Sequence, residues 1–240
     1  MMRIDVVTPF PTMLESFLRE SILARAQEKG AVRIVVWNLR DFTTDRHKTV
    51  DDYPYGGGAG MILKPEPVFK AVDEIRKSDS SDTLRILLMS PQGLAFSQPM
   101  AEALSKENHL VLICGHYRGV DERIVQALVT DEISIGDYIL SGGELAAAVV
   151  IDSVARLLPG VLGNADSAEG DSFSSGILDH PHYTRPEEFR GMRVPEVLLS
   201  GHHADIARWR EQKAAEKTKH RRPDLFNRMD RRQPNMPESF

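Results

Sequence analysis

Residues 109–119 read His-Leu-Val-Leu-Ile-Cys-Gly-His-Tyr-Arg-Gly. The apolar run that ends at Cys114 is continuous, which is typical of a strand buried on both faces of a parallel sheet. Glycine follows at once, as expected where a strand ends in a turn. The run Leu84 to Met89, followed by Ser90-Pro91-Gln92-Gly93, has the same form. Two such strands predict an α/β domain built around a mostly parallel sheet.

The segments on either side of these strands continue the alternation. Strands are predicted at Met2 to Thr8 and Val32 to Leu39, with a third, short strand before Ser134. Pro11 to Lys29 is predicted to be one amphipathic helix, because Met13, Phe17, Ile22 and Ala26 recur near the helical period. We expect helices on both faces of the sheet. The other predicted helices are Pro67 to Lys77, Ser97 to Lys106, Asp121 to Leu128 and Gly143 to Leu157.

The alternation stops at residue 160. Residues 160–180 contain four Gly, four Ser and three Asp and have almost no apolar periodicity, which is typical of a flexible linker. The chain is therefore predicted to consist of an α/β domain at 1–159, a linker at 160–180 and a small, mainly helical domain at 181–240. The last residues, around Pro234 and Pro237, are expected to fray.

Composition excludes several classes of protein. The 240 residues are 41% hydrophobic and 27% charged, as in ordinary globular proteins. Cys114 is the only cysteine, so an internal disulfide and a multi-thiolate zinc site are excluded, and a reducing compartment such as the cytoplasm is expected. The longest apolar run, Leu145 to Ile151, is far shorter than the roughly 20 residues of a membrane span. We therefore expect a cytoplasmic protein with no membrane association.

Charge is unevenly distributed along the chain. The formal net charge is −5, yet residues 201–240 hold ten Lys and Arg against six Asp and Glu. A basic end on an acidic protein suggests an anionic partner. A solvated helix face explains the same residues equally well, and charge alone does not separate the two interpretations.

Three glycine-containing segments follow predicted strands, at Ser90 to Gly93, Cys114 to Arg123 and Ser134 to Glu144. Open α/β sheets bind ligands at the carboxyl ends of their strands, so these segments are expected to wall one pocket. A fourth segment, Asp51 to Met61, is either a ligand-binding turn or a solvated hairpin. The glycine run at 56–60 lacks the dinucleotide-binding spacing, and no nucleotide-phosphate loop is present, so a generic nucleotide-binding domain is the weakest interpretation.

In this order and spacing, the four segments resemble the bacterial tRNA (guanine-N1)-methyltransferases of the SPOUT superfamily. The resemblance covers nearly the whole chain and implies a deep trefoil knot at the carboxyl end of the α/β domain. It also implies S-adenosylmethionine as methyl donor, tRNA with guanine at position 37 as substrate, and a homodimer with a composite active site. Further motifs that carry it are 151–156, 159–164, 171–173, 182–186 and 197–203.

The resemblance assigns roles to individual residues. Asp171 would be the general base that removes the proton of guanine N1, and Arg156 would bind guanine O6. Substrate contacts would come from Asp52, Gly57, Gly58, His182, His202, Arg208 and Arg210, with Trp209 or Tyr183 stacking on a base. The donor would be bound by Met89, Ser90, Pro91, Gly115, Tyr117, Ile135, Gly136, Asp137, Tyr138, Ile139, Leu140, Gly142 and Gly143.

Metal binding is not predicted from the residues. The family is reported to depend on Mg²⁺, but no Asp/Glu cluster resembles a dedicated cage, so any Mg²⁺ would be shared with water or substrate. His180, His182, His202 and His203 lie at spacings that do not predict a metal site.

Two residues depart from the family pattern. Arg118 stands where a glutamate is common, and His116 replaces a usual arginine. If Arg118 is merely tolerated, Arg118→Glu is expected to raise the affinity for the donor. Two alternatives remain open: a SPOUT methyltransferase with another RNA target, and an RNA-binding homologue that has lost its chemistry.

Overall fold

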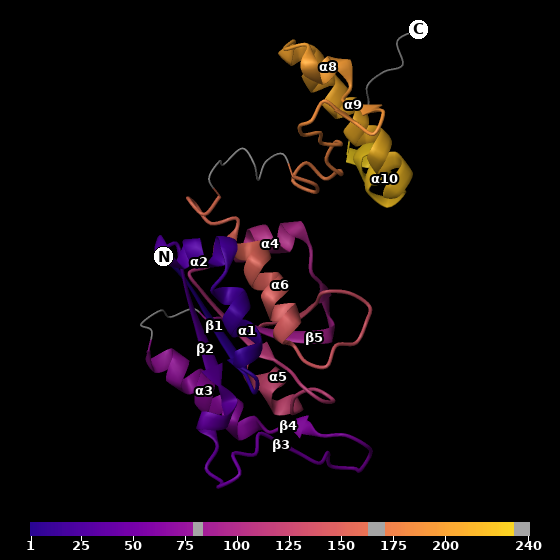
Figure 1. Cartoon of the computed structure of the whole chain (residues 1–240). Helices are drawn as coiled ribbons and strands as arrows, with labels where there is room; N and C mark the ends of the chain where they lie inside the picture. Colours follow the sequence, from indigo (N-terminus) through magenta and orange to yellow (C-terminus); the bar gives the residue numbers. More distant parts are fainter. Residues whose placement is uncertain (79–83, 163–170, 233–240) are drawn as a thin grey trace. The chain divides into compact units, whose positions relative to one another are not determined.

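The computed structural model describes residues 1–78, 84–162 and 171–232 (Figure 1). These residues form two compact units, Met1–Gly163 and Asn164–Phe240. Residues 163–170 of the predicted linker, and the carboxyl-terminal residues expected to fray, lie outside the described residues. Among the helices that the structure describes, none combines the length and hydropathy that a membrane crossing requires.

A five-stranded sheet forms the centre of unit 1, and each pair of neighbouring strands is parallel, which confirms the predicted sheet. The order is β2-β1-β6-β5-β7. Every residue of the central strand β6 is buried, as its unbroken apolar run predicts. The strands are β1 (Met2–Thr8), β2 (Val32–Asn38), β5 (Arg85–Ala95), β6 (His109–Cys114) and β7 (Asp131–Ser134).

Helices cover both faces of this sheet, as expected (Figure 1). Alternate residues of β6 point to opposite faces: Leu110 and Leu112 belong to one core cluster, Val111 and Ile113 to the other. The first face is covered by α1 (Thr12–Leu18), α2 (Ser21–Glu28), α4 (Gln98–Leu104) and α6 (Glu144–Ala155). The second is covered by α3 (Pro65–Lys77), α5 (Glu122–Leu128) and the short 3-10 helix η1 (Leu39–Phe42).

The single helix predicted for Pro11 to Lys29 is wrong, because the chain breaks into α1 and α2. Ser21 adopts a left-handed backbone conformation at φ 53°, which no continuous helix allows. The Gln27 side chain donates a hydrogen bond to the Leu18 carbonyl at 2.8 Å, so α2 supports the end of α1. Met13, predicted to face the core, is 48% exposed, whereas its neighbour Leu14 is buried.

The turn predicted at Ser90 to Gly93 is also wrong, since β5 continues through these residues to Ala95. The pairing of β5 with β7 shifts register between Met89 and Leu94, so the extra residues form a bulge. A Cβ atom on Gly93 would lie 2.3 Å from the backbone of Glu132. Glycine is needed here because two strands come into close contact, not because the strand ends.

Unit 2 is built on one long helix, α9 (His203–Arg221). Residues 171–180 are anchored to it: the Leu178 N–H donates to the Thr218 hydroxyl, and the Lys217 ammonium donates to the Asp179 carbonyl, both at 3.0 Å. The rest of the unit consists of the hairpin β8 (Glu188–Phe189) and β9 (Met192–Arg193) and of helices α8 (Glu196–Leu199) and α10 (Pro223–Arg232).

A buried carboxylate ties three strands together at the start of the sheet. Asp5 is fully buried and accepts hydrogen bonds from Arg3 at 2.7 Å and Trp37 at 2.6 Å, with His109 Nε2 at 2.5 Å. Burial alone would raise the pKa of Asp5, but the contacts with His109, Arg3 and Trp37 outweigh it and lower that pKa. The charged form of Asp5 therefore stabilises the fold.

Asp5→Asn is expected to lower the free energy of unfolding at neutral pH by about 3 kcal/mol, because it leaves buried donors without a charged acceptor. A lowered folded pKa gives stability that is present above the unfolded pKa and is lost as pH falls through the folded value. The difference between wild type and variant should therefore shrink below about pH 4. Denaturant unfolding across pH measures it, with the exposed Asp73→Asn as control; equal stability of Asp5→Asn at pH 7 would contradict this role.

Candidate active site

A pocket of about 400 Å³ opens at the carboxyl edge of the sheet. Its walls are the bulge of β5, the loop after β6, the loop after β7 and the first residues of α6. This size lies within the range of small-molecule sites, and the carboxyl edge is where open α/β sheets place them. The three segments that sequence analysis singled out thus surround one pocket.

The structure places most of the predicted donor-binding residues in this lining. Asp137 is the exception: it lies on the same loop but is exposed and does not line the pocket. The lining includes Met89, Ser90, Pro91, Gly115, Tyr117, Ile135, Gly136, Tyr138, Ile139, Leu140, Gly142 and Gly143.

Gly143, which lines this pocket, packs closely against β5 and β6. The Gly143 N–H donates to the Gly115 carbonyl at 2.8 Å. A Cβ atom on Gly143 would lie 2.8 Å from the Cα of Cys114 and 2.9 Å from the Cβ of Met89. Met89, where the bulge of β5 begins, and Cys114, the last residue of β6, thus meet the start of α6 at a distance that only glycine allows.

A buried carboxylate behind this wall was missed by sequence analysis. Glu144 is fully buried at the first turn of α6, and its Oε1 accepts the Thr8 hydroxyl at 2.6 Å. Its Oε2 has no hydrogen-bond partner among the described residues and lies 3.8 Å from His116 Nε2. Burial, together with the charge of Glu144, raises the pKa of the Cys114 thiol well above its usual value. The signal in the sequence was that Glu144 is an acidic residue at the start of an otherwise mostly apolar helix.

Arg118 binds the glycine run at residues 56–60. Its guanidinium donates to the Ala59 carbonyl at 2.8 Å, and its backbone N–H donates to the Met61 carbonyl at 3.1 Å. The run joins β3 (Asp51–Asp52) to β4 (Ile62–Leu63), an antiparallel pair, so the segment is a hairpin, and its contact with a ligand stays a prediction. The predicted substrate residues Asp52, Gly57 and Gly58 are exposed on it. Arg118, which lines the pocket, connects this hairpin to the pocket wall.

The two predicted catalytic residues lie in different units. Arg156 follows the last residue of α6 in unit 1. Asp171 begins a turn of unit 2, where its carbonyl accepts the Ser174 hydroxyl at 2.6 Å. His202 precedes α9, and Arg208 and Arg210 are exposed on it.

Several of the basic side chains of α9 already have acidic partners. Arg208 pairs with Asp205 on the preceding turn, and Lys213 pairs with Glu216 at 2.7 Å. Such exposed pairs contribute little to stability and exchange readily. The exposed surface of α9 therefore carries both positive and negative charges. This part of the helix agrees with the interpretation of a solvated helix face.

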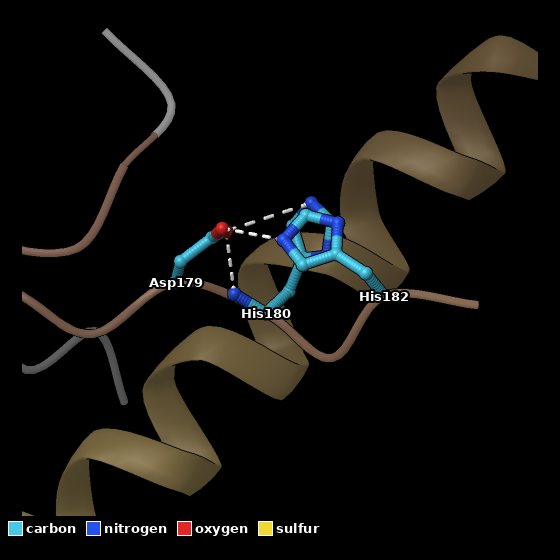
Figure 2. Close-up of side chains that lie close together, drawn as sticks. All are labelled: Asp179, His180 and His182. Atoms are coloured by element: carbon cyan, nitrogen blue, oxygen red, sulfur yellow. Dashed lines mark hydrogen bonds and ion pairs between the residues drawn. The ribbon is translucent and has the colours of Figure 1, made fainter. Parts of the chain in front are cut away.

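A second group of polar side chains gathers in unit 2, where sequence analysis predicted no joint site. Asp179, His180 and His182 place their ligating atoms within 4.8 Å of one another (Figure 2). Partial burial would raise the pKa of Asp179, but hydrogen bonds from His182 and the His180 backbone outweigh it, so that pKa is lowered. His182 had been assigned to the substrate only, and Asp179 had been given no role.

The model of one protein family, described as tRNA (Guanine-1)-methyltransferase TrmD, matches residues 2–228. The chain belongs to this family. Individual relatives agree with the match. A tRNA (guanine-N(1)-)-methyltransferase of Anoxybacillus flavithermus is 62% identical over 94% of this chain and 91% of its own length. Proteins of the same name from Geobacillus kaustophilus and Dictyoglomus turgidum are 61% and 57% identical over 94% and 95% of the chain, and over 92% and 91% of their own lengths.

An alanine substitution tests the close packing of Gly143 in this member of the tRNA (guanine-1)-methyltransferase family. Gly143→Ala is expected to lower the melting temperature by several degrees and to weaken donor binding, because overpacking against backbone costs about 1–3 kcal/mol. Gly115→Ala is the matched control in the same wall: its Cβ would meet Met89 O at an ordinary 3.6 Å. Differential scanning fluorimetry compares the two. Equal melting temperatures for Gly143→Ala and wild type would contradict the close packing.

Proposed function

We propose that this chain transfers a methyl group from S-adenosylmethionine to N1 of guanine 37 in tRNA. The observation that carries this proposal is the pocket at the carboxyl edge of the sheet, in a chain whose family match spans residues 2–228. Since tRNA is modified where it is made and used, we also infer that the protein works in the cytoplasm.

The residues of the pocket fit the proposed donor. Ile133, Ile135 and Leu140 give it an apolar side, and Gly115, Gly136 and Gly142 line it without side chains of their own. The donor supplies an electrophilic methyl group on a sulfonium and leaves as a neutral thioether. We further propose that the three segments at residues 90–93, 114–123 and 134–144 form the trefoil knot of the superfamily. The bridge between His116 and Gly142, which brings the last two of these segments together, supports that path.

The chemistry requires a base, because neutral guanine carries a proton on N1. As the new N–C bond forms and the S–C bond breaks, the N1 proton must leave, and we propose that the Asp171 carboxylate takes it. Loss of that proton moves negative charge onto guanine O6, which the Arg156 guanidinium would stabilise. Asp171 and Arg156 thus have complementary tasks on one base.

We propose that the active site is shared between the subunits of a homodimer. Arg156 and Asp171 lie in different units, so a composite site would combine unit 1 of one copy with unit 2 of the other. Helix α6, which leads to Arg156, exposes Leu145 at 54% and Val149 at 43% one turn apart. Neighbouring apolar side chains of this kind support burial against a second copy.

Unit 2 is the proposed tRNA-binding part. Tyr183 is half exposed with its ring 6.3 Å from that of Trp209, so either ring could stack on an unpaired anticodon-loop base. Exposed Arg208, Arg210 and His202 would meet phosphates. Any Mg²⁺ that the reaction uses would bind through water and substrate oxygens.

Methyl transfer from labelled S-adenosylmethionine to a tRNA transcript with guanine at positions 36 and 37 tests this function. Wild type should form 1-methylguanosine at position 37, identified by nucleoside mass spectrometry. Asp171→Asn should lower turnover by about 100-fold or more while donor binding, measured by calorimetry, is unchanged. A different methylated nucleoside would favour another RNA target. Binding of donor and tRNA without product would favour an RNA-binding homologue, with Arg118 as the first residue to test.

Mixing two inactive variants tests the composite site. In a hybrid dimer of Asp171→Asn and Arg156→Ala, one of the two shared sites regains both native residues and the other loses both. Random subunit exchange should therefore restore roughly a quarter of wild-type activity, since about half of the dimers are hybrids. If both residues came from one subunit, the mixture would stay inactive. Native mass spectrometry of the mixture, with one variant isotopically labelled, controls for subunit exchange.

A further inference from the structure

Asp179, His180 and His182 converge from one short segment of unit 2. Asp179 Oδ2 lies 2.5 Å from His182 Nε2, and Asp179 Oδ1 lies 3.7 Å from His180 Nε2. The two imidazole rings are 4.3 Å apart and both turn a nitrogen toward the carboxylate (Figure 2). The Asp179 and His180 side chains are only 20% and 18% exposed, whereas that of His182 is 68% exposed. Asp179 and His180 are therefore mostly buried, and the group is open to solvent at His182.

Three hydrogen bonds fix the backbone of this segment without a ligand. The Asp179 N–H donates to the Ser172 hydroxyl at 3.0 Å, and the Asp179 carbonyl accepts the Lys217 ammonium at the same distance. Leu178 is bound to Thr218 of α9. A site with a fixed backbone loses little conformational entropy on binding, which favours affinity.

We propose that Asp179, His180 and His182 form a binding site for a divalent transition-metal ion of the Zn²⁺ type, with a fourth position open to water. Two imidazoles and one carboxylate are the ligand set of open zinc sites. Mg²⁺ prefers oxygen ligands and would be a poor occupant of a site that offers two nitrogens. None of its three residues lines the pocket of unit 1, and His182 is also a predicted substrate contact.

The side chains need only small shifts to coordinate such an ion. Bonds of about 2.0–2.1 Å in a tetrahedral arrangement place neighbouring ligand atoms about 3.3 Å apart. His182, the most exposed of the three, would move away from Asp179 by less than about 1 Å as a metal replaces their hydrogen bond. His180 Nδ1 lies 3.1 Å from the Pro181 carbonyl, a contact that puts the proton on Nδ1 and leaves the Nε2 lone pair for the metal.

Occupancy would act on the turn that carries Asp171. The Ser172 hydroxyl accepts the Asp179 N–H, and Ser174 donates to the Asp171 carbonyl, so the two parts of the segment are joined by short hydrogen bonds. A metal ion that links residues 179, 180 and 182 removes conformations from this segment. Amide hydrogen exchange of residues 171–182 is therefore expected to slow when Zn²⁺ is bound.

Titration of the full chain, freed of any purification tag, tests the site directly. Zn²⁺ should bind with one-to-one stoichiometry per chain, and Co²⁺ should develop the intense visible absorption of a tetrahedral complex. His180→Ala and His182→Ala should each weaken Zn²⁺ binding by about tenfold or more, and excess Mg²⁺ should not displace it. His47→Ala, which removes an exposed histidine of unit 1, should bind Zn²⁺ as wild type does.

Two results would overturn the proposal. The first is a Co²⁺ spectrum in the presence of protein that is indistinguishable from that of the hydrated ion. The second is Zn²⁺ affinity that is unchanged in the double variant His180→Ala/His182→Ala, since the metal would then be bound elsewhere. Because His182 is largely exposed, its variant should keep the wild-type circular dichroism and melting temperature, so a loss of metal affinity reports on the ligand itself.

Discussion

The close contact of Gly143 with the bulge of β5 and the end of β6 is the constraint on which the pocket depends. It leaves no room for a Cβ atom, and it places the first turn of α6 directly against Cys114 and Met89. The loops after β6 and β7 are thereby drawn to one side of the sheet, where their backbone groups face the same space. Glu144, the next residue, is buried by the same packing and fixes α6 to Thr8 of β1. The position of Arg156 at the end of α6 follows from this start.

Patterns that depend on local burial were predictable from sequence. The unbroken apolar run of β6 can be satisfied only between two helical layers, and the structure places it there. Features set by a distant partner were not. The sequence predicts a turn at Gly93, because its close neighbour, Glu132, is far away in sequence. The break at Ser21 and the burial of Glu144 depend on packing in the same way. Asp179 joins two histidines only because α9 anchors its backbone.

Division of the chain into two units gives the proposed chemistry a physical logic. Arg156 ends a helix packed on the sheet, whereas Asp171 belongs to a turn of unit 2. If Asp171 is the base, as we propose, methyl transfer requires both kinds of unit to engage the same tRNA, which would limit it to the intended base. Arg118 ties the hairpin at residues 51–63 to the pocket wall through Ala59. That bond gives the arginine a structural role beyond mere tolerance.

We propose that the bulge of β5 and the loops after β6 and β7 bind the methyl donor. A crystal structure of the chain with S-adenosylhomocysteine, the product of the donor, shows whether they do. We expect the adenosine moiety in contact with the backbone of Gly115, Gly136 and Gly142, and the sulfur directed toward Arg156 and the partner's Asp171. Density for the ligand outside this pocket, or in it with the adenosine clear of all three segments, would rule this binding mode out.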